Sequence, residues 1–182
     1  ALGNPNSAST STDNTVTYDA SAPTVTINQA AGQADPTNAS PIHFTVVFSE
    51  AVADFATGDV SLSGTAGATT ATVTGSGATY DVAVSGMTGD GTVIADVAAG
   101  AAQDGVGNLS NASTSTDKTV TYDITQPTVT IDQAAGQSDP TGTSPIDFTV
   151  VFSEPVTDFD DASDVTLSGT AGATSALITE IA

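Results

Sequence analysis

The sequence predicts an all-β protein made of tandem seven-stranded antiparallel sandwiches, and three observations support this prediction. First, Thr15–Glu50 returns as Thr119–Glu154, 104 residues later, with 28 of 36 positions identical. Second, apolar and polar residues alternate with a period of two in several short segments, as they do in half-buried strands. Third, threonine, serine, glycine and alanine dominate the remaining sequence, which favours strands and turns over helices. A repeat of about 104 residues has the size of one sandwich domain.

The repeat divides the chain into three parts. Residues 8–13, Ala-Ser-Thr-Ser-Thr-Asp, recur as residues 112–117. We therefore expect residues 1–19 to be the tail of a preceding repeat, including its last strand (G), and residues 20–123 to form one complete repeat. Residues 124–182 are expected to supply the first part, strands A to D, of the next repeat. The chain is interpreted as a section of a longer array in which each repeat contacts only its neighbours.

Alternation places the strands within the complete repeat. Ile42, Phe44 and Val46 share one face of a predicted strand, and the residues between them lie on the other face. Glycine-rich and proline-containing turns separate this strand from similar segments. The pattern predicts seven strands, A to G, at about 24–29, 42–49, 59–63, 69–75, 79–85, 92–98 and 117–123.

Seven short strands in one repeat are typical of two antiparallel sheets packed face to face, the immunoglobulin-like (Ig-like) architecture. The sequence contains no Trp and no Cys. It therefore lacks the buried Trp and the disulfide of antibody domains, and the predicted likeness to those domains is one of architecture only.

Short motifs in both copies resemble those of a known family. Phe48-Ser-Glu-Ala-Val52 and Phe152-Ser-Glu-Pro-Val156 are each followed by Asp-Phe and Asp-Val pairs, and Asp104-Gly-Val-Gly-Asn108 comes later. In this order the motifs are similar to the F-S-E-P-V … D-x-x-G-N pattern of bacterial Ig-like repeat domains of large surface and adhesin proteins. The chain departs from that pattern at Ala51, where Pro is usual, and at Asp54 and Asp158, where Gly is usual. The resemblance implies an extracellular stalk or adhesin module at the cell surface.

Charge excludes several classes of partner. One Lys or Arg stands against 21 Asp and Glu, so the formal net charge is −20. Nucleic acid is not an expected partner, because neutralising phosphates requires many Lys and Arg side chains. Insertion of this segment into a membrane is not expected either, because no apolar run approaches the roughly 20 residues that span a bilayer. The acidity also suits a long exposed polymer that must remain soluble.

Catalysis is not expected. The chain has no Cys and a single His, and the position equivalent to His43 in the next copy is Asp147. His43 falls on the outward face of its predicted strand, so we expect it to face solvent. No nucleophile with an adjacent base is evident, and the sequence predicts no catalytic residue and no enzyme activity.

Calcium at the joints between repeats is the expected chemistry. Of the 21 acidic residues 18 are Asp, which is common in turns and in calcium sites. In an Ig-like sandwich, loops B–C and F–G lie at the end where the chain enters, and loops A–B and E–F lie at the opposite end. The predicted ligands at the entry joint are Asp19, Glu50, Asp104 and Asn108. Those at the following joint are Asp35, Asp90, Asp123 and Glu154.

A simpler interpretation of the same residues stays open. Glu50 and Asp104 could accept backbone N–H groups inside their own loops, and Asp104 could serve only as a turn former. Asn38-Ala-Ser40, Asn108-Leu-Ser110 and Asn111-Ala-Ser113 also match the N-glycosylation pattern, which arises often by chance in a chain rich in Ser and Thr.

The expected function is therefore mechanical: an extracellular spacer or stalk repeat of a long surface adhesin or filament protein, with neighbouring repeats of the same chain as partners. One alternative is a module that binds glycans or a host protein. That alternative needs exposed aromatic residues, whereas Tyr18, Tyr80 and Tyr122 are expected to point inward. Another alternative is assembly of like chains into an extracellular fibre.

Overall fold

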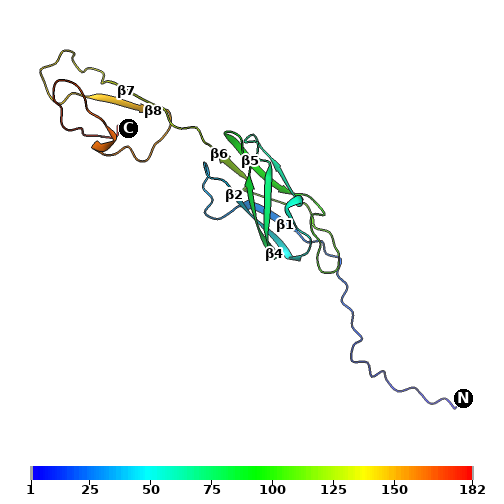
Figure 1. Cartoon of the computed structure of the whole chain (residues 1–182). Helices are drawn as coiled ribbons and strands as arrows, with labels where there is room; N and C mark the ends of the chain where they lie inside the picture. The colour runs from blue at the N-terminus through cyan, green and yellow to red at the C-terminus, as the bar shows by residue number, and fades with distance from the viewer. Residues whose placement is uncertain (1, 182) are drawn as a thin grey trace. The chain divides into compact units, whose positions relative to one another are not determined.

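The computed structural model describes residues 2–181 and confirms an all-β fold of small antiparallel sheets (Figure 1). The chain forms two compact units, Ala1–Ile124 and Thr125–Ala182. The division after residue 124 lies one residue from the predicted boundary between residues 123 and 124. The first unit contains β1 (Val25–Gln29), β2 (Ile42–Val52), the 3₁₀ turn η1 (Thr57–Asp59), β3 (Val60–Ser63), β4 (Thr70–Ser85), β5 (Gly91–Val97) and β6 (Thr119–Tyr122). The second unit contains β7 (Val129–Gln133), β8 (Phe148–Phe152) and the 3₁₀ turn η2 (Ala162–Asp164).

Two three-stranded sheets form the first unit. One sheet has the order β1-β2-β4 and the other β3-β5-β6, and every pair of neighbours within them is antiparallel. The positions of β1, β2, β3, β5 and β6 agree with predicted strands A, B, C, F and G within a few residues. Several of the loops that join them contain Gly at positive φ, for example Gly64 (φ 105°) after β3. Such a backbone conformation is open to Gly because it has no Cβ.

Predicted strands D and E are the two arms of β4. Thr69 N donates to Ser85 O at 3.1 Å, and a Cβ on Gly75 would lie 2.6 Å from Thr79 O. The chain therefore folds back on itself between Gly75 and Thr79, and the two halves of β4 lie side by side as a hairpin. Its second arm pairs with β2, for example Tyr80 with Val46.

Both sheets contribute to one hydrophobic core. Alternate residues of β2 are buried as the period-two pattern predicts, and Phe44 is fully buried. Val82 from β4 and Val93 from β5 belong to the same buried cluster. Burial of this aliphatic surface is the main favourable term in folding. The buried cluster consists of Val, Ile, Ala, Phe and Tyr side chains.

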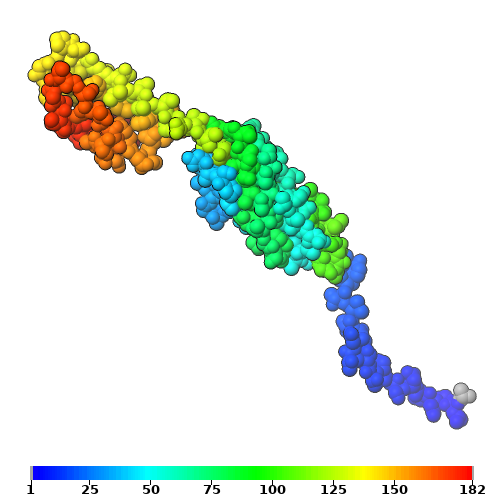
Figure 2. Space-filling view, in the orientation of Figure 1, coloured from blue at the N-terminus to red at the C-terminus, as the bar shows by residue number. Residues whose placement is uncertain are grey.

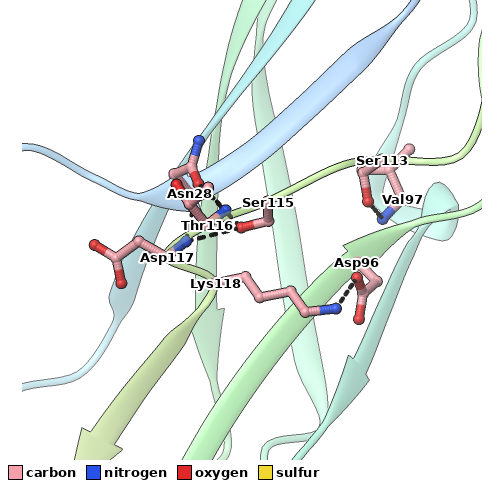
Figure 3. Close-up of polar contacts among 8 residues, drawn as sticks. All are labelled: Asn28, Asp96, Val97, Ser113, Ser115, Thr116, Asp117 and Lys118. Atoms are coloured by element: carbon pink, nitrogen blue, oxygen red, sulfur yellow. Dashed lines mark hydrogen bonds and ion pairs between the residues drawn. The ribbon is translucent and has the colours of Figure 1, made fainter.

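The segment before β6 passes from the edge of the β1-β2-β4 sheet to the β3-β5-β6 sheet. A cluster of hydrogen bonds around Asn28 holds the segment where it crosses (Figure 3). Thr114 lies parallel to β1, where its N donates to Val25 O at 3.0 Å and its O accepts from Ile27 N at 3.3 Å. Asn28 Oδ1 then accepts from Ser115 Oγ at 3.0 Å and from the backbone N of residues 116 and 117 at 3.3 and 3.2 Å. Beyond this cluster the chain pairs with β5 instead.

The second unit repeats only the beginning of the first. β7 and β8 pair in the same register as β1 and β2, since Ile131 faces Val150 as Ile27 faces Val46. Strands C and D, which we expected in the next repeat, are not formed, because residues 165–181 contain no strand. The apolar face of the β7–β8 pair remains exposed, with Phe148 59% exposed where Phe44 is 0%. Without a second sheet to cover them, these side chains have no core to enter.

The tail differs from its expected state as well. Residues 2–19 contain no strand, and Figure 2 shows them as an extended chain, coloured dark blue. Tyr18, expected to point inward, is 89% exposed. Its copy Tyr122 is half-buried because β6 pairs with β5. The tail has the sequence of a last strand but lacks a sheet to join.

Candidate metal centre

Three of the four residues predicted for the entry joint lie together. One carboxylate oxygen from each of Asp19, Glu50 and Asp104 lies within 4.8 Å of the others. We call these residues the acidic trio. Asp19 is exposed, Glu50 is half-buried and Asp104 is buried. The fourth predicted residue, Asn108, is in contact with two of them: its Nδ2 donates to Asp104 Oδ2 at 2.8 Å and to Asp19 O at 3.4 Å.

Backbone pairing brings Asp19 next to Glu50. Ser49 N donates to Thr24 O at 2.9 Å, and Thr24 N donates to Ser49 Oγ at 3.0 Å. This reciprocal pair holds the chain that enters β1 against β2, one residue before Glu50. Before this pair in the chain, Asp19 Oδ1 accepts a hydrogen bond from Ser21 N at 2.9 Å, which closes a local turn. The register of β2 against β4 shifts between Val47 and Val52, so Glu50 lies where the regular ladder is interrupted.

A tight loop positions Asp104. Its Oδ1 accepts from Val106 N and from Asn108 N, both at 2.9 Å. Asp104 N also donates to Asn108 O at 3.1 Å, which closes the loop. Gly107 allows the turn, because its φ of 95° is open to glycine. The loop-forming role expected as the simpler interpretation is therefore present, and it leaves the carboxylate facing its acidic neighbours.

The hydrogen bonds of this loop favour the charged carboxylate. Burial raises the pKa of Asp104, but the Asn108 side-chain amide and backbone N–H groups of the loop outweigh burial and hold that pKa below its usual value. Asp104 is therefore ionised at neutral pH, beside two further carboxylates.

Among residues 2–181, no basic side chain is placed to neutralise the trio. The single residue of the Lys and Arg type, Lys118, has its Nζ 2.6 Å from Asp96 Oδ1. The single histidine has its Nδ1 3.0 Å from an oxygen of Asp81. Both of these ion pairs lie outside the trio. Three carboxylates held this close repel one another, and a bound cation would offset that repulsion.

The donor set suits a hard cation. The groups at hand are carboxylates, the backbone carbonyl of Asp19 and the side-chain amide of Asn108, and Ca²⁺ takes ligands of these kinds at 2.3–2.6 Å. Rotating the Asn108 amide by half a turn would direct its Oδ1, a possible calcium ligand, where Nδ2 now points. The residues present therefore fit calcium by chemistry.

The second predicted set has a different character. Asp35 Oδ1 accepts from Thr121 N at 2.9 Å, and Asp90 Oδ1 accepts from Ile124 N at 2.7 Å. Asp123 N donates to Thr37 O at 2.9 Å. Within residues 2–181 the acidic trio is the group of three that meets the metal-site spacing, and these three residues do not form another. Glu154 belongs to the second unit, so a site that includes it remains a prediction.

Sequence reasoning missed some polar contacts. The His43 side chain is 41% exposed, in agreement with the expected solvent-facing position, but its Nδ1 also lies 3.0 Å from Asp81 Oδ1 on β4, a contact that the sequence does not predict. The cluster around Asn28 was also not predicted. A signal for it was present, because Ser115-Thr-Asp117 recurs in the tail with no change.

Comparisons with protein-family models, curated proteins and solved structures find no match for this chain. Within residues 2–181, no helix has the length and apolarity required to cross a membrane.

Proposed function

We propose that this chain is an extracellular spacer: a section of a stalk made of tandem seven-stranded Ig-like sandwiches, belonging to a long surface adhesin or filament protein and stiffened by Ca²⁺ where one repeat follows another. The observation that carries the proposal is the acidic trio. Asp19 lies on the segment that enters the complete repeat, whereas Glu50 and Asp104 belong to the body of that repeat.

The position of Asp19 gives such a site a mechanical role. Asp19 is the copy of Asp123, which directly follows the last strand of the complete repeat. In an array, Asp19 would therefore close one repeat while Glu50 and Asp104 open the next. An ion bound by all three would fasten the connecting segment to the sandwich and limit bending between repeats.

The aromatic residues of the complete repeat, residues 20–123, support a spacer more than a binding module, whereas Tyr18 on the tail is 89% exposed. Tyr80 is buried against Phe48 and Phe55, with ring centroids 6.0 and 5.0 Å away. Tyr122 is half-buried against the core. Neither ring exposes a face on which a sugar could stack. A glycan array with clear hits would favour the alternative of an adhesion module.

Calcium titration with a matched pair of variants tests the proposal. Thermal unfolding of the first unit is followed with added Ca²⁺ and with a chelator, and small-angle X-ray scattering gives the maximum dimension. We expect Ca²⁺ to raise the midpoint for the wild type, because an ion that binds only the folded state stabilises it. The ordering of the entry segment should also shift the scattering profile.

Asp19→Asn should lose most of the calcium response. Asp13→Asn should keep it, because Asp13 lies on the same exposed tail and is not part of the trio. If chelation changes neither the midpoint nor the scattering profile of the wild type, calcium is excluded and only an ion-free spacer remains.

A further inference from the structure

The chain that leaves the first unit is held beyond the end of its last strand. β6 ends at Tyr122, yet the backbone N–H groups of the next two residues both have acceptors in the first unit. Asp123 N donates to Thr37 O at 2.9 Å, and Ile124 N donates to Asp90 Oδ1 at 2.7 Å. The segment is therefore fixed to its own unit up to the residue at which that unit ends.

One part of this hold is a short piece of parallel pairing. Thr37, in the loop between β1 and β2, lies parallel to Tyr122. Thr37 N donates to Thr121 O at 2.9 Å, and Thr37 O accepts from Asp123 N. Two residues earlier in the loop, Asp35 Oδ1 accepts from Thr121 N at 2.9 Å. The loop therefore covers the outer edge of β6, the last strand of its sheet.

Two of the four hydrogen bonds described here have carboxylate acceptors. Asp35 lies in the β1–β2 loop and Asp90 lies in the loop between β4 and β5. An ionised carboxylate binds a backbone N–H more strongly than a neutral carbonyl does, and it needs no metal to do so. Both residues were predicted as calcium ligands of the following joint. Each has a backbone donor on Oδ1, which is a structural role that requires no ion.

The loop that covers β6 recurs in the next copy. Gln33-Ala-Asp-Pro-Thr-Asn38 returns as Gln137-Ser-Asp-Pro-Thr-Gly142, so Asp139 and Thr141 stand at the positions of Asp35 and Thr37. The two positions that change within this loop are not those that bind the outgoing segment. The hold is therefore expected in successive repeats and not in one copy only.

The chain enters the second unit at another fixed point. Thr128 N donates to Ser153 Oγ, and Ser153 N donates to Thr128 O, both at 2.9 Å. Residues 125–127 lie between Ile124 and this pair, and the last of them is Pro127, whose ring fixes its φ. Three residues thus separate the last anchored position of one unit from the first anchored position of the next.

We propose that Asp35, Thr37 and Asp90 form an exit clamp, which fixes the outgoing chain of the repeat without metal. Movement between successive repeats is then confined to the three residues that follow Ile124. Asp35 and Asp90 act in this clamp as positioning residues, because each holds a backbone N–H of the outgoing chain.

The exit clamp gains a second effect from the proposed metal centre, and this step rests on the proposed function. Asp123 is the copy of Asp19, whose carboxylate belongs to the acidic trio. In an array, one repeat would hold the backbone of each such Asp on both sides of its Cα, and the ion of the next repeat would hold its carboxylate. Only the two side-chain torsions of this Asp would then lie between the two holds.

Hydrogen exchange of the whole chain in excess chelator, followed by NMR, tests the exit clamp. The amides of Thr121, Asp123 and Ile124 should exchange at least about tenfold more slowly than in an unstructured peptide. Asp90→Ala should remove most of the protection of Ile124 and leave that of Thr121. Asp35→Ala should have the opposite effect on these two amides, because each variant removes one acceptor.

A distant amide shows whether each variant remains folded. Thr114 N is bonded to Val25 O at 3.0 Å and takes no part in the exit clamp. Its exchange rate should stay within a few-fold of the wild type in both alanine variants. Asp35 and Asp90 are exposed, so truncating either side chain opens no cavity in the core.

Asparagine at position 90 separates the clamp from a metal site. Asp90→Asn keeps an oxygen acceptor and should retain the protection of Ile124 to within a few-fold in chelator. If Asp90 served as a calcium ligand instead, Ile124 would be protected only after Ca²⁺ is added, and Asp90→Asn would lose that protection. Protection that depends on Ca²⁺, or that survives in Asp90→Ala, would overturn the proposal.

Asp19→Asn distinguishes this proposal from the proposed metal centre. The variant should lose the calcium response of the first unit and leave the exchange of Ile124 unchanged, whereas Asp90→Ala should do the reverse. A wild type with a protected Ile124 and no calcium response would contradict the metal centre alone. A calcium response with an unprotected Ile124 would contradict the exit clamp alone.

Discussion

Asn108 donates twice to the Asp104 carboxylate: its backbone N donates to Oδ1 at 2.9 Å and its side-chain amide donates to Oδ2 at 2.8 Å. The same amide reaches the carbonyl of Asp19 at 3.4 Å. One asparagine thus orients a buried carboxylate and contacts the segment that enters the sandwich. Both residues belong to the Asp-Gly-Val-Gly-Asn motif, so a local turn and a candidate inter-repeat contact share the same five residues.

The first prediction concerns acid. Because the folded-state pKa of Asp104 lies below the ordinary value of 3.8 for an aspartate, the carboxylate contributes stability that is present above that value. This stability is lost as the pH falls through the folded pKa. The free energy of unfolding of the first unit should therefore decrease as the pH is lowered below about 4. Denaturant unfolding at successive pH values measures this decrease.

Asp104→Asn is the control for the acid prediction. The variant keeps a side-chain oxygen but cannot ionise, so its unfolding free energy should fall less steeply over the same pH range. An identical pH profile for the two proteins would show that other carboxylates dominate the acid transition.

The second prediction compares two copies of one phenylalanine. Phe44→Ala empties a fully buried core position and should lower the free energy of unfolding of the first unit by about 3–5 kcal/mol. Phe148→Ala truncates the exposed copy and should leave that transition unchanged. Urea unfolding followed by tyrosine fluorescence measures both. A large effect of Phe148→Ala on the first unit would contradict the division of the chain into two separate units.

The third prediction concerns the β4 hairpin. Gly75 has a φ of 129°, and a Cβ there would lie 2.6 Å from the backbone oxygen of Thr79. Gly75→Ala should therefore destabilise the first unit by about 1–3 kcal/mol in thermal unfolding. Gly77→Asn is the matched control, because a Cβ at Gly77 meets nothing within 4 Å and Asn tolerates its φ of 72°. Comparable losses in both variants would mean that glycine flexibility, rather than close approach, matters here.

The fourth prediction concerns Lys118. Its ion pair with Asp96 is part-exposed, since each side chain is 39% accessible. Lys118→Asn, which installs the residue found in the tail, should cost less than about 1 kcal/mol, and the cost should shrink at high salt. Chemical unfolding at low and high ionic strength checks this. A salt-independent loss of several kcal/mol would show that Lys118 packs rather than pairs.

Much of the fold could be predicted because strand periodicity is a local signal. The buried face of β2, with Ile42 and Phe44, follows directly from alternation. The close approach of Asp19, Glu50 and Asp104 could be predicted because loop order in a sandwich determines which loops share an end. The merging of strands D and E into β4 depends on the backbone at Gly75, which the residue pattern does not reveal.

Other features depend on partners that a local pattern cannot supply. Leu167 and Leu177 lie in segments that copy strands C and D, yet residues 165–181 form no strand. The propensity is present, but the second arm of β4, β5 and β6, which complete the sheets in the first unit, have no counterpart in residues 125–181. Tyr18 is exposed for the same reason. Strand sequence alone does not make a strand, because most of its stability comes from neighbours.

The parallel contact between Thr26 and Thr114 has a consequence for how the first unit resists stretching. Because these segments run in the same direction, tension applied before β1 and after β6 pulls them past each other lengthwise. The bonds around Val25, Ile27 and Gln29 then share the force and must rupture together, rather than one after another as in a peeled hairpin. A domain connected in this way holds against a pull along its strands, which is the direction in which a tether is strained.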